Sequence, residues 1–254
     1  MVQPTFSLIG KPPAPARASH VPAPRRTAPV WRVLAGVCVM WGTAATAWAA
    51  CSDPPNAGVD WTACEKVRLV LRGSNLAGAR LAGADLNGTD LQKANLTGAD
   101  LTHASVDRAR LSGADLSRAK LVQLNGYRAN LSGAIMVGAD LTKAEMARAN
   151  LASANLSNAN LRKAELQRTN LEGSKLDGAN FTSAELARTN FAKATLQGAR
   201  MAQARTFRTR FEGVDLTAVV GLTQAQLESS CGDAATRLPA GLHAPKSWPC
   251  AKED

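Results

Sequence analysis

The side chains that do most enzyme chemistry are scarce in this sequence and are not arranged for it. After residue 50 it has two histidines, His103 and His243, and neither is set beside a nucleophile as its base. The sequence has no residues at metal-ligand spacing. It also has no phosphate-binding glycine loop and no dinucleotide fingerprint, since its glycines recur at multiples of five, which is typical of turns. The carboxylates recur at regular outward positions, which favours a solvated surface over an acid-base pair. The sequence therefore predicts no enzyme, no cofactor and no metal.

Arginine is the residue whose spacing does point to chemistry. Six arginines, which we call the arginine column, stand 20 residues apart at Arg108, Arg128, Arg148, Arg168, Arg188 and Arg208. If they stack on one side of a fold, their like charges repel and need carboxylates, solvent or a ligand to neutralise them. The arginine column is therefore the candidate interaction face, and the groups it would bind are carboxylates or phosphates.

Two interpretations of the arginine column remain open. In the first, the charges are neutralised locally, because three of the arginines follow a glutamate by three residues, at Glu145, Glu165 and Glu185. An exposed ion network of this kind contributes little to stability. In the second, the arginines that lack such a glutamate join Arg205 and Arg210 in patches that are open to an anionic ligand. Those arginines are Arg108, Arg128 and Arg208.

The element that positions the arginines is a repeat of five residues. It runs from Leu69 to Ala218 without insertion or deletion. Counting every fifth residue from Leu71 to Leu216 gives 30 positions, of which 28 are Leu, Val, Met or Phe and the others are Gly126 and Thr206. Ala, Ser or Thr stands two residues before nearly all of them. Neither a helix nor a strand has this period, whereas a solenoid that turns a corner every five residues does.

The pattern A-[DN]-L-x-x resembles that of the pentapeptide-repeat proteins, over about 150 residues. The resemblance implies an all-β fold, a right-handed quadrilateral β-helix with four pentapeptides per coil and with the Leu-type and Ala-type residues inside. Like residues recur 20 apart, which supports that coil length independently, as at Asn130, Asn150, Asn170 and Asn190. Seven and a half coils, with a strand spacing of about 4.8 Å, predict a rod of about 36 Å. At Leu124-Asn125-Gly126 large and small residues are exchanged, which predicts one repacked corner.

The segments on either side of the repeat are expected to cap the rod. Residues 50–68 would form a small N-terminal cap with Trp61 over the first coil, and residues 219–254 a C-terminal cap with a short helix. That helix would begin at a capping box of Thr223 and Gln226 and end near Cys231-Gly232. Both ends resemble those of exported members of the family.

Four cysteines remain after residue 50, and they lie at opposite ends of the repeat. They are Cys51, Cys64, Cys231 and Cys250. Three pairings are possible, but a rigid rod would hold the two ends apart. We therefore expect one disulfide in each cap, joining Cys51 to Cys64 and Cys231 to Cys250.

Residues 1–49 are expected to be a disordered basic lead-in and a signal peptide. Residues 30–50 carry a basic flank, an apolar stretch and then Ala47-Trp48-Ala49, which matches a cleavage site. An uncleaved membrane anchor, a lipoprotein acylated at Cys51 and a twin-arginine signal at Arg25-Arg26 are alternatives. Membrane contact is expected only through an uncleaved leader.

These features predict an exported bacterial protein, periplasmic or secreted, that presents an interaction surface. Its partner would be an unknown protein or an anionic envelope polymer held by the arginine column, and the rod would be a monomer or an end-to-end dimer. The resemblance also offers an alternative, since some family members mimic DNA and bind type II topoisomerases in the cytoplasm. A DNA mimic needs an acidic face, but residues 69–218 hold 20 basic and 13 acidic residues. A nucleic acid partner is not expected either.

Overall fold

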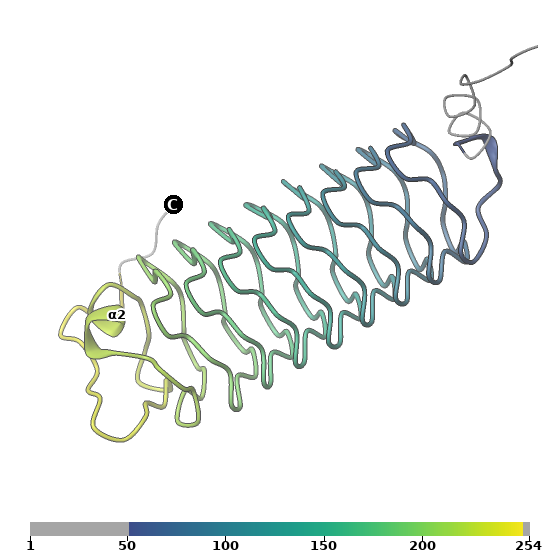
Figure 1. Ribbon diagram of the computed structural model, residues 1–254. Coiled ribbons are helices and arrows are strands. Elements are labelled where there is room, and N and C mark those ends of the chain that lie inside the picture. Colours follow the sequence, from purple (N-terminus) through teal and green to yellow (C-terminus); the bar gives the residue numbers. More distant parts are fainter. Residues whose placement is uncertain (1–50, 251–254) are drawn as a thin grey trace, which may run out of the picture. The chain divides into compact units, whose positions relative to one another are not determined.

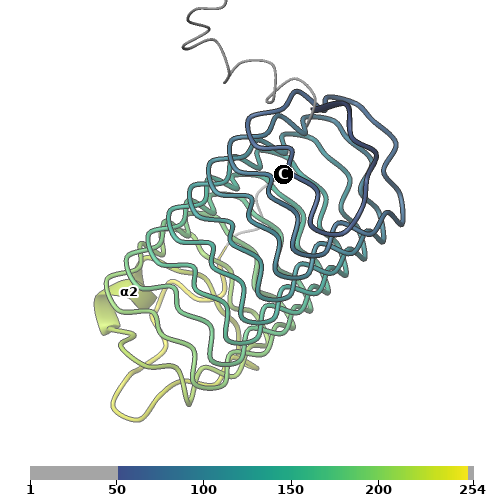
Figure 2. The ribbon, with the colours of Figure 1, turned by 45° about the vertical axis from the view of Figure 1, so that its right-hand side comes forward.

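The computed structural model describes residues 51–250, so the lead-in and signal peptide expected in residues 1–49 lie outside the described residues. From residue 56 the described chain winds in successive coils that stack along one axis (Figure 1). The chain turns after every five residues and meets the coil before it after 20, so each coil has four sides. Figure 2 shows the stacked coils in an oblique view. The predicted coil of four pentapeptides is therefore present.

Isolated parallel β-bridges join the coils. The first links Asp60 to Arg80, and those that follow, up to Arg200 with Val220, also join residues 20 apart. Each five-residue segment contributes one bridging residue and then turns, so long strands do not form. The backbone amides on both sides of the bridge continue the ladder, as where Leu151 N donates to Asn170 O at 2.7 Å.

The interior is built from the two inward positions of each pentapeptide. Leu151 and Ala154 are both fully buried, and all 28 large apolar residues of the repeat are buried with them. Near the C-terminal end leucine gives way to phenylalanine, and the rings of Phe191 and Phe211 stack with centroids 5.4 Å apart. Burial of apolar columns on this scale is the main force that holds the rod together.

The two exceptions in the column of large residues have separate explanations. Three side chains surround the place of a Gly126 side chain, since a Cβ built there would lie 3.4 Å from Val106 Cγ2, 3.5 Å from Met146 Cγ and 3.8 Å from Leu124 Cδ2. Leu124 itself is 2 % exposed, so this corner is repacked as predicted. Thr206 is buried, and its hydroxyl donates to Gln226 O at 2.7 Å, which ties the coil to the C-terminal cap.

Many of the Asn and Asp residues that stand directly before a large one hold the turn that follows. In the segment of Asp140, the backbone amide of Thr142 donates to Asp140 Oδ1 at 3.0 Å. Asn130 and Asn150 hold Ser132 and Ala152 in the same way, at 3.1 Å each. An Asn or Asp side chain that accepts from the amide two residues on is an Asx turn, which explains the preference for these residue types.

The solenoid begins earlier than the expected boundary at residue 69. Asp60 already bridges Arg80, Trp61 occupies the inward leucine position with 1 % exposure, and Cys64 occupies the inward alanine position. Lys66 stands at the next leucine position, with its Nζ 3.9 Å from the centre of the Trp61 ring. Burial lowers the pKa of Lys66. The boundary was wrong because a tryptophan and the stem of a lysine replace leucine here.

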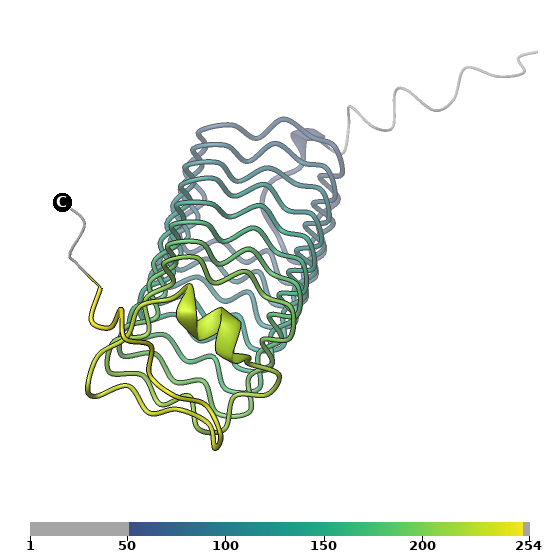
Figure 3. The same ribbon diagram turned by 90° about the vertical axis from the view of Figure 1, so that its left-hand side faces the viewer.

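The C-terminal cap covers the last coil with a short helix and an irregular segment. Helix α2, Gln224–Glu228, has the predicted capping box, in which Thr223 N donates to Gln226 Oε1 at 2.8 Å. The helix ends at Glu228, earlier than expected, and lies across the end of the rod (Figure 3). Beyond it, Cys231 bridges Arg210 and Arg237 bridges Asp215, so the ladder continues into the cap.

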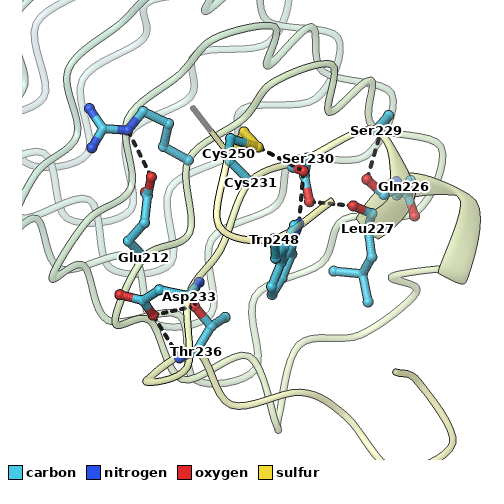
Figure 4. Close-up of a disulfide and its surroundings, with 11 residues drawn as sticks. Glu212, Gln226, Leu227, Ser229, Ser230, Cys231, Asp233, Thr236, Trp248 and Cys250 are labelled. Carbon is cyan, nitrogen blue, oxygen red and sulfur yellow. Dashed lines mark hydrogen bonds and ion pairs between the residues drawn. A yellow bond between two sulfur atoms is a disulfide. The ribbon is translucent and has the colours of Figure 1, made fainter. Parts of the chain in front are cut away.

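Each pair of terminal cysteines is joined. Cys51 and Cys64 have Cα atoms 5.5 Å apart, and Cys231 and Cys250 have Cα atoms 5.4 Å apart. The second disulfide lies beside Trp248, whose indole donates to Ser230 O at 2.8 Å (Figure 4). Within residues 51–250, no helix has the length and apolar character needed to cross a membrane.

Candidate interaction face

The arginine column lies along one side of the rod. Its residues occupy the same corner of successive coils, each with φ between 52° and 61°, at Arg108, Arg128, Arg148, Arg168, Arg188 and Arg208. Arg68, with φ 58°, stands at the same corner two coils before Arg108, and Gly88 takes the corner between them. We call this surface, with Arg68 and Gly88 included, the arginine face. The sequence analysis missed Arg68 because it precedes the expected start of the repeat.

The backbone at these corners disfavours the arginines. A positive φ costs an L-residue about 1–2 kcal/mol, and glycine avoids that cost. Two of the other corners accordingly hold mostly glycine, as at Gly73, Gly113 and Gly133. On the arginine face, seven of eight levels hold arginine instead. The remaining corner also holds non-glycine residues at seven of its eight levels, such as His103, Lys143 and Gln203, but of mixed types. A single residue type at seven of eight levels is what distinguishes the arginine face.

The arginine column is not neutralised in the expected way. Among residues 51–250, no ion pair within 4.0 Å joins Glu145, Glu165 or Glu185 to the arginine three residues later. Glu185 instead pairs with Arg205, with Oε1 and Nη1 2.9 Å apart. Arg205 follows Glu185 by one coil, and a bridge joins the two residues. The expected pairing of each glutamate with the arginine three residues later was wrong. Residues stacked in neighbouring coils are close along the axis, whereas the arginine corner is separated from the glutamate by three residues and a turn of the chain.

The same axial pairing occurs on the other faces. Arg110 Nη2 lies 2.6 Å from Asp90 Oδ2 one coil earlier, and Lys120 Nζ lies 3.8 Å from Asp100 Oδ2. Arg210, expected to be open to a ligand, pairs with Glu212 at 3.1 Å. Within the described part of the chain, by contrast, five residues of the arginine face form no ion pair within 4.0 Å, namely Arg68, Arg108, Arg128, Arg148 and Arg168.

Aromatic rings and cavities add to the arginine face. Arg128 lies over the ring of Tyr127, 5.2 Å from its centroid, and Arg208 lies 5.8 Å from the centroid of Phe207, which is 57 % exposed. A cavity of about 700 Å³ lies at the C-terminal end of this face, lined by Arg188, Phe207 and Arg208 among others.

A smaller cavity, which we call the Gly88 notch, lies at the opposite end of the arginine face. Its volume is about 310 Å³. Its lining residues are Val67, Arg68, Asn87, Gly88, Asp107, Arg108 and Tyr127. Both cavities therefore lie on the surface that carries the arginine column.

The arginine face carries groups that bind anions. Guanidinium groups bind carboxylates, phosphates and sulfates through paired N–H donors. His103 and His243 are both exposed, and the four cysteines of residues 51–250 are in disulfides. Among residues 51–250, no cluster of His, Cys, Asp and Glu could hold a metal ion.

Comparisons with known proteins agree with the fold. The family model for pentapeptide repeats (8 copies) matches residues 70–108 and 109–146, and the model for the pentapeptide repeat region matches residues 144–219. No curated protein matches the chain in a sequence search.

Two solved structures illustrate the likeness. QnrB1, a plasmid-mediated fluoroquinolone resistance protein, is 16% identical with a TM-score of 0.51, and the match covers 71% of this chain and 90% of QnrB1. HetL, from the cyanobacterium Nostoc sp. strain PCC 7120, is 27% identical with a TM-score of 0.37, over 81% of this chain and 100% of HetL. The family models together span residues 70–219, which is the whole solenoid except its first turns. The chain therefore belongs to the pentapeptide-repeat family.

Proposed function

We propose that this protein is a non-catalytic scaffold whose arginine face binds an anionic partner outside the cytoplasm. The observation that carries the proposal is the repetition of one residue type, arginine, at seven of the eight levels of a single corner. Five of these arginines form no ion pair within residues 51–250, so their donors are available to a ligand. Pentapeptide-repeat proteins act as scaffolds, and a rod with a charged side suits that role.

The location and the class of partner are inferred from chemistry. Two disulfides at the ends of the rod are typical of proteins that work in an oxidising compartment. The signal-peptide pattern of residues 30–50 favours export to that compartment. A basic surface attracts anionic polymers there, and an anionic polymer of the bacterial envelope is the partner we propose.

The DNA-mimic alternative is not favoured by the charges of the face. A surface that replaces DNA must be acidic, whereas the arginine face is basic. The likeness to QnrB1 supports the fold alone at 16% identity. We therefore keep the scaffold with an anionic partner as the single proposed function.

Changing three arginines of the face to glutamine should weaken polyanion binding at least tenfold. The variant is Arg128→Gln/Arg148→Gln/Arg168→Gln, which avoids residues with ion pairs among the described residues. A hydrogen bond to a charged group contributes about 1.5–3 kcal/mol, so losing one or two such bonds accounts for the effect. Retention on a polyglutamate column, measured against salt concentration, gives the result, and its salt dependence should flatten.

The matched control removes three charges from other faces, with Arg162→Gln/Lys175→Gln/Arg200→Gln. These residues are exposed and lie away from the arginine column. If net charge alone governs retention, both variants weaken it equally, and the proposal fails. Thermal unfolding of both should match the natural protein, because exposed charges contribute little to stability.

Export can be tested by mass. Expressed from Met1 in a bacterium, the protein recovered from the envelope or medium should begin near Ala50, since Ala47-Trp48-Ala49 matches a cleavage site. Its intact mass should increase by about four hydrogens on reduction, because two disulfides hold its four remaining cysteines. A protein that keeps residues 1–49 and is found only in the cytoplasm with free thiols would refute the proposed location.

A further inference from the structure

The arginine face is interrupted at a single level, and the interruption is a cavity. Gly88 replaces the arginine of its level, and the Gly88 notch opens between Arg68 and Arg108. A Cβ on Gly88 would lie 3.3 Å from Arg68 Cγ, so the stem of Arg68 lies against this level and would have to shift to admit a side chain. Two coils separate the arginines, which places their backbones about 10 Å apart. Arg68 and Arg108 both line the notch, which therefore has two cations and no side chain at the level of Gly88 between them.

The wall of the Gly88 notch holds a fixed hydrogen-bond donor next to a fixed acceptor. Asn87 Oδ1 accepts from Asp107 N at 2.7 Å and from Ser105 Oγ at 2.7 Å. Because a backbone amide can only donate, this fixes the orientation of the Asn87 amide and leaves its NH₂ group as a donor. Asp107 Oδ1 accepts from Tyr127 N at 2.8 Å, which fixes that carboxylate in turn. Its second oxygen has no partner within residues 51–250, so it is available as an acceptor.

This combination selects against a simple inorganic anion. Phosphate or sulfate would meet the Asp107 carboxylate as a like charge, at a cost in binding. A neutral sugar would use the donor, the acceptor and the ring of Tyr127 but would leave both guanidinium groups unused. A sugar with a carboxylate uses all of them, since its carboxylate binds arginine and its hydroxyls both donate and accept. The notch, of about 310 Å³, is open to solvent, so it has room for one sugar unit held at the surface and not enclosed.

We propose that the Gly88 notch binds one acidic sugar unit, a hexuronate, of an anionic polysaccharide. The carboxylate pairs with Arg68 or Arg108, neighbouring hydroxyls bond to Asn87 and Asp107, and the apolar side of the ring packs near Tyr127. This inference rests on the proposed function, because it names the chemistry of the partner that the arginine face meets. It adds a specific subsite to a surface that otherwise attracts anions in general.

The variant Gly88→Arg distinguishes a specific subsite in the Gly88 notch from general anion binding by the arginine face. It fills the notch and completes the row of arginines, and the corner accepts arginine at Arg108 and Arg128 with φ 55° and 58°. The contact that the new Cβ makes is with the flexible Arg68 side chain, so the fold should be kept. The matched control is Gly78→Arg, which adds the same charge at an equivalent corner of another face, where a Cβ meets nothing within 4 Å.

Calorimetric titration of the full chain with tetragalacturonic acid tests the subsite. We expect Gly88→Arg to weaken binding at least tenfold and Gly78→Arg to leave it unchanged, while retention of Gly88→Arg on polyglutamate holds or rises. Unchanged or tighter binding of the uronate by Gly88→Arg would overturn the subsite and leave the arginine face intact. Competition by inorganic phosphate at the same concentration as the uronate would also overturn it, in favour of a general anion site.

The triple variant of the arginine face completes the design. Arg128→Gln/Arg148→Gln/Arg168→Gln leaves Arg68 and Arg108 in place, so uronate binding should fall by a smaller factor than polyglutamate retention does. If polyglutamate retention is unaffected but Gly88→Arg still abolishes uronate binding, the proposed function fails and the subsite stands. If the uronate binds the natural protein no better than maltotetraose, a neutral tetrasaccharide, the notch is not an acidic-sugar site.

Discussion

Replacing Leu151 by aspartate is expected to lower the free energy of unfolding by at least about 4 kcal/mol. Leu151 is fully buried in the middle of the rod, and the residues one coil before and after it, Leu131 and Leu171, are buried leucines. A carboxylate at this position has no partner and must either stay charged in an apolar interior or take up a proton. Urea denaturation followed by circular dichroism measures the loss.

The matched control for this prediction is Ser153→Asp, two residues away. Ser153 is at the corner, exposed and with φ 58°, a conformation that aspartate accepts better than most residues. Its free energy of unfolding should stay within about 0.5 kcal/mol of the natural protein. Equal stability of the two variants would mean that the column of large residues does not face inward.

The repacked corner allows a prediction in which two damaging changes cancel. Leu124→Ala should cost about 3–5 kcal/mol, because Gly126 has no side chain to fill the space that is lost. Gly126→Leu alone should cost about 1–3 kcal/mol, since Leu124 already occupies the site. The double variant restores the order of large and small residues found in every neighbouring pentapeptide, and it should lie within about 1 kcal/mol of the natural protein.

The readout is the coupling between the two sites. Unfolding free energies of the four proteins form a double-mutant cycle, and the interaction should be favourable by several kcal/mol. Additive losses would show that the side chain of Leu124 does not fill the space beside Gly126. The space beside Gly126 would then belong to Val106 and Met146, which lie 3.4 Å and 3.5 Å from a Cβ built there.

The period of five predicts the solenoid almost completely, because one inward leucine and one inward alanine per segment leave a single way to bury the apolar side chains. It fails where other residue types fill the same places. Trp61 and Lys66 occupy leucine positions, and no pattern based on Leu, Val, Met or Phe finds them. The capping box at Thr223 was predictable because its hydrogen bonds are local, whereas the exact end of α2 depends on contacts with the coil beneath it.

The candidate site was predictable in its position but not in its pairing. A spacing of 20 residues brings the arginine column together, and continuing that spacing backwards from Arg108 reaches Gly88 and then Arg68. The position of the Gly88 notch could therefore be predicted from the sequence once the coil length was known. The partner of Glu185 was not, because the choice between Arg205 and Arg188 depends on the geometry of the corner and not on spacing.

The positive φ of the arginine corners also determines how this surface can evolve. Each corner accepts glycine or a side chain without a change in the path of the backbone, as Gly88 and Arg108 show at successive levels. The distance between levels is set by backbone hydrogen bonds, at about 4.8 Å, and stays the same whatever the side chain. Single substitutions can therefore add or delete charges one at a time along a linear pattern of constant pitch. The rod therefore presents charged and uncharged corner residues at a constant spacing. Substitutions at these corners alone can match that pattern to the charge spacing of a polymer.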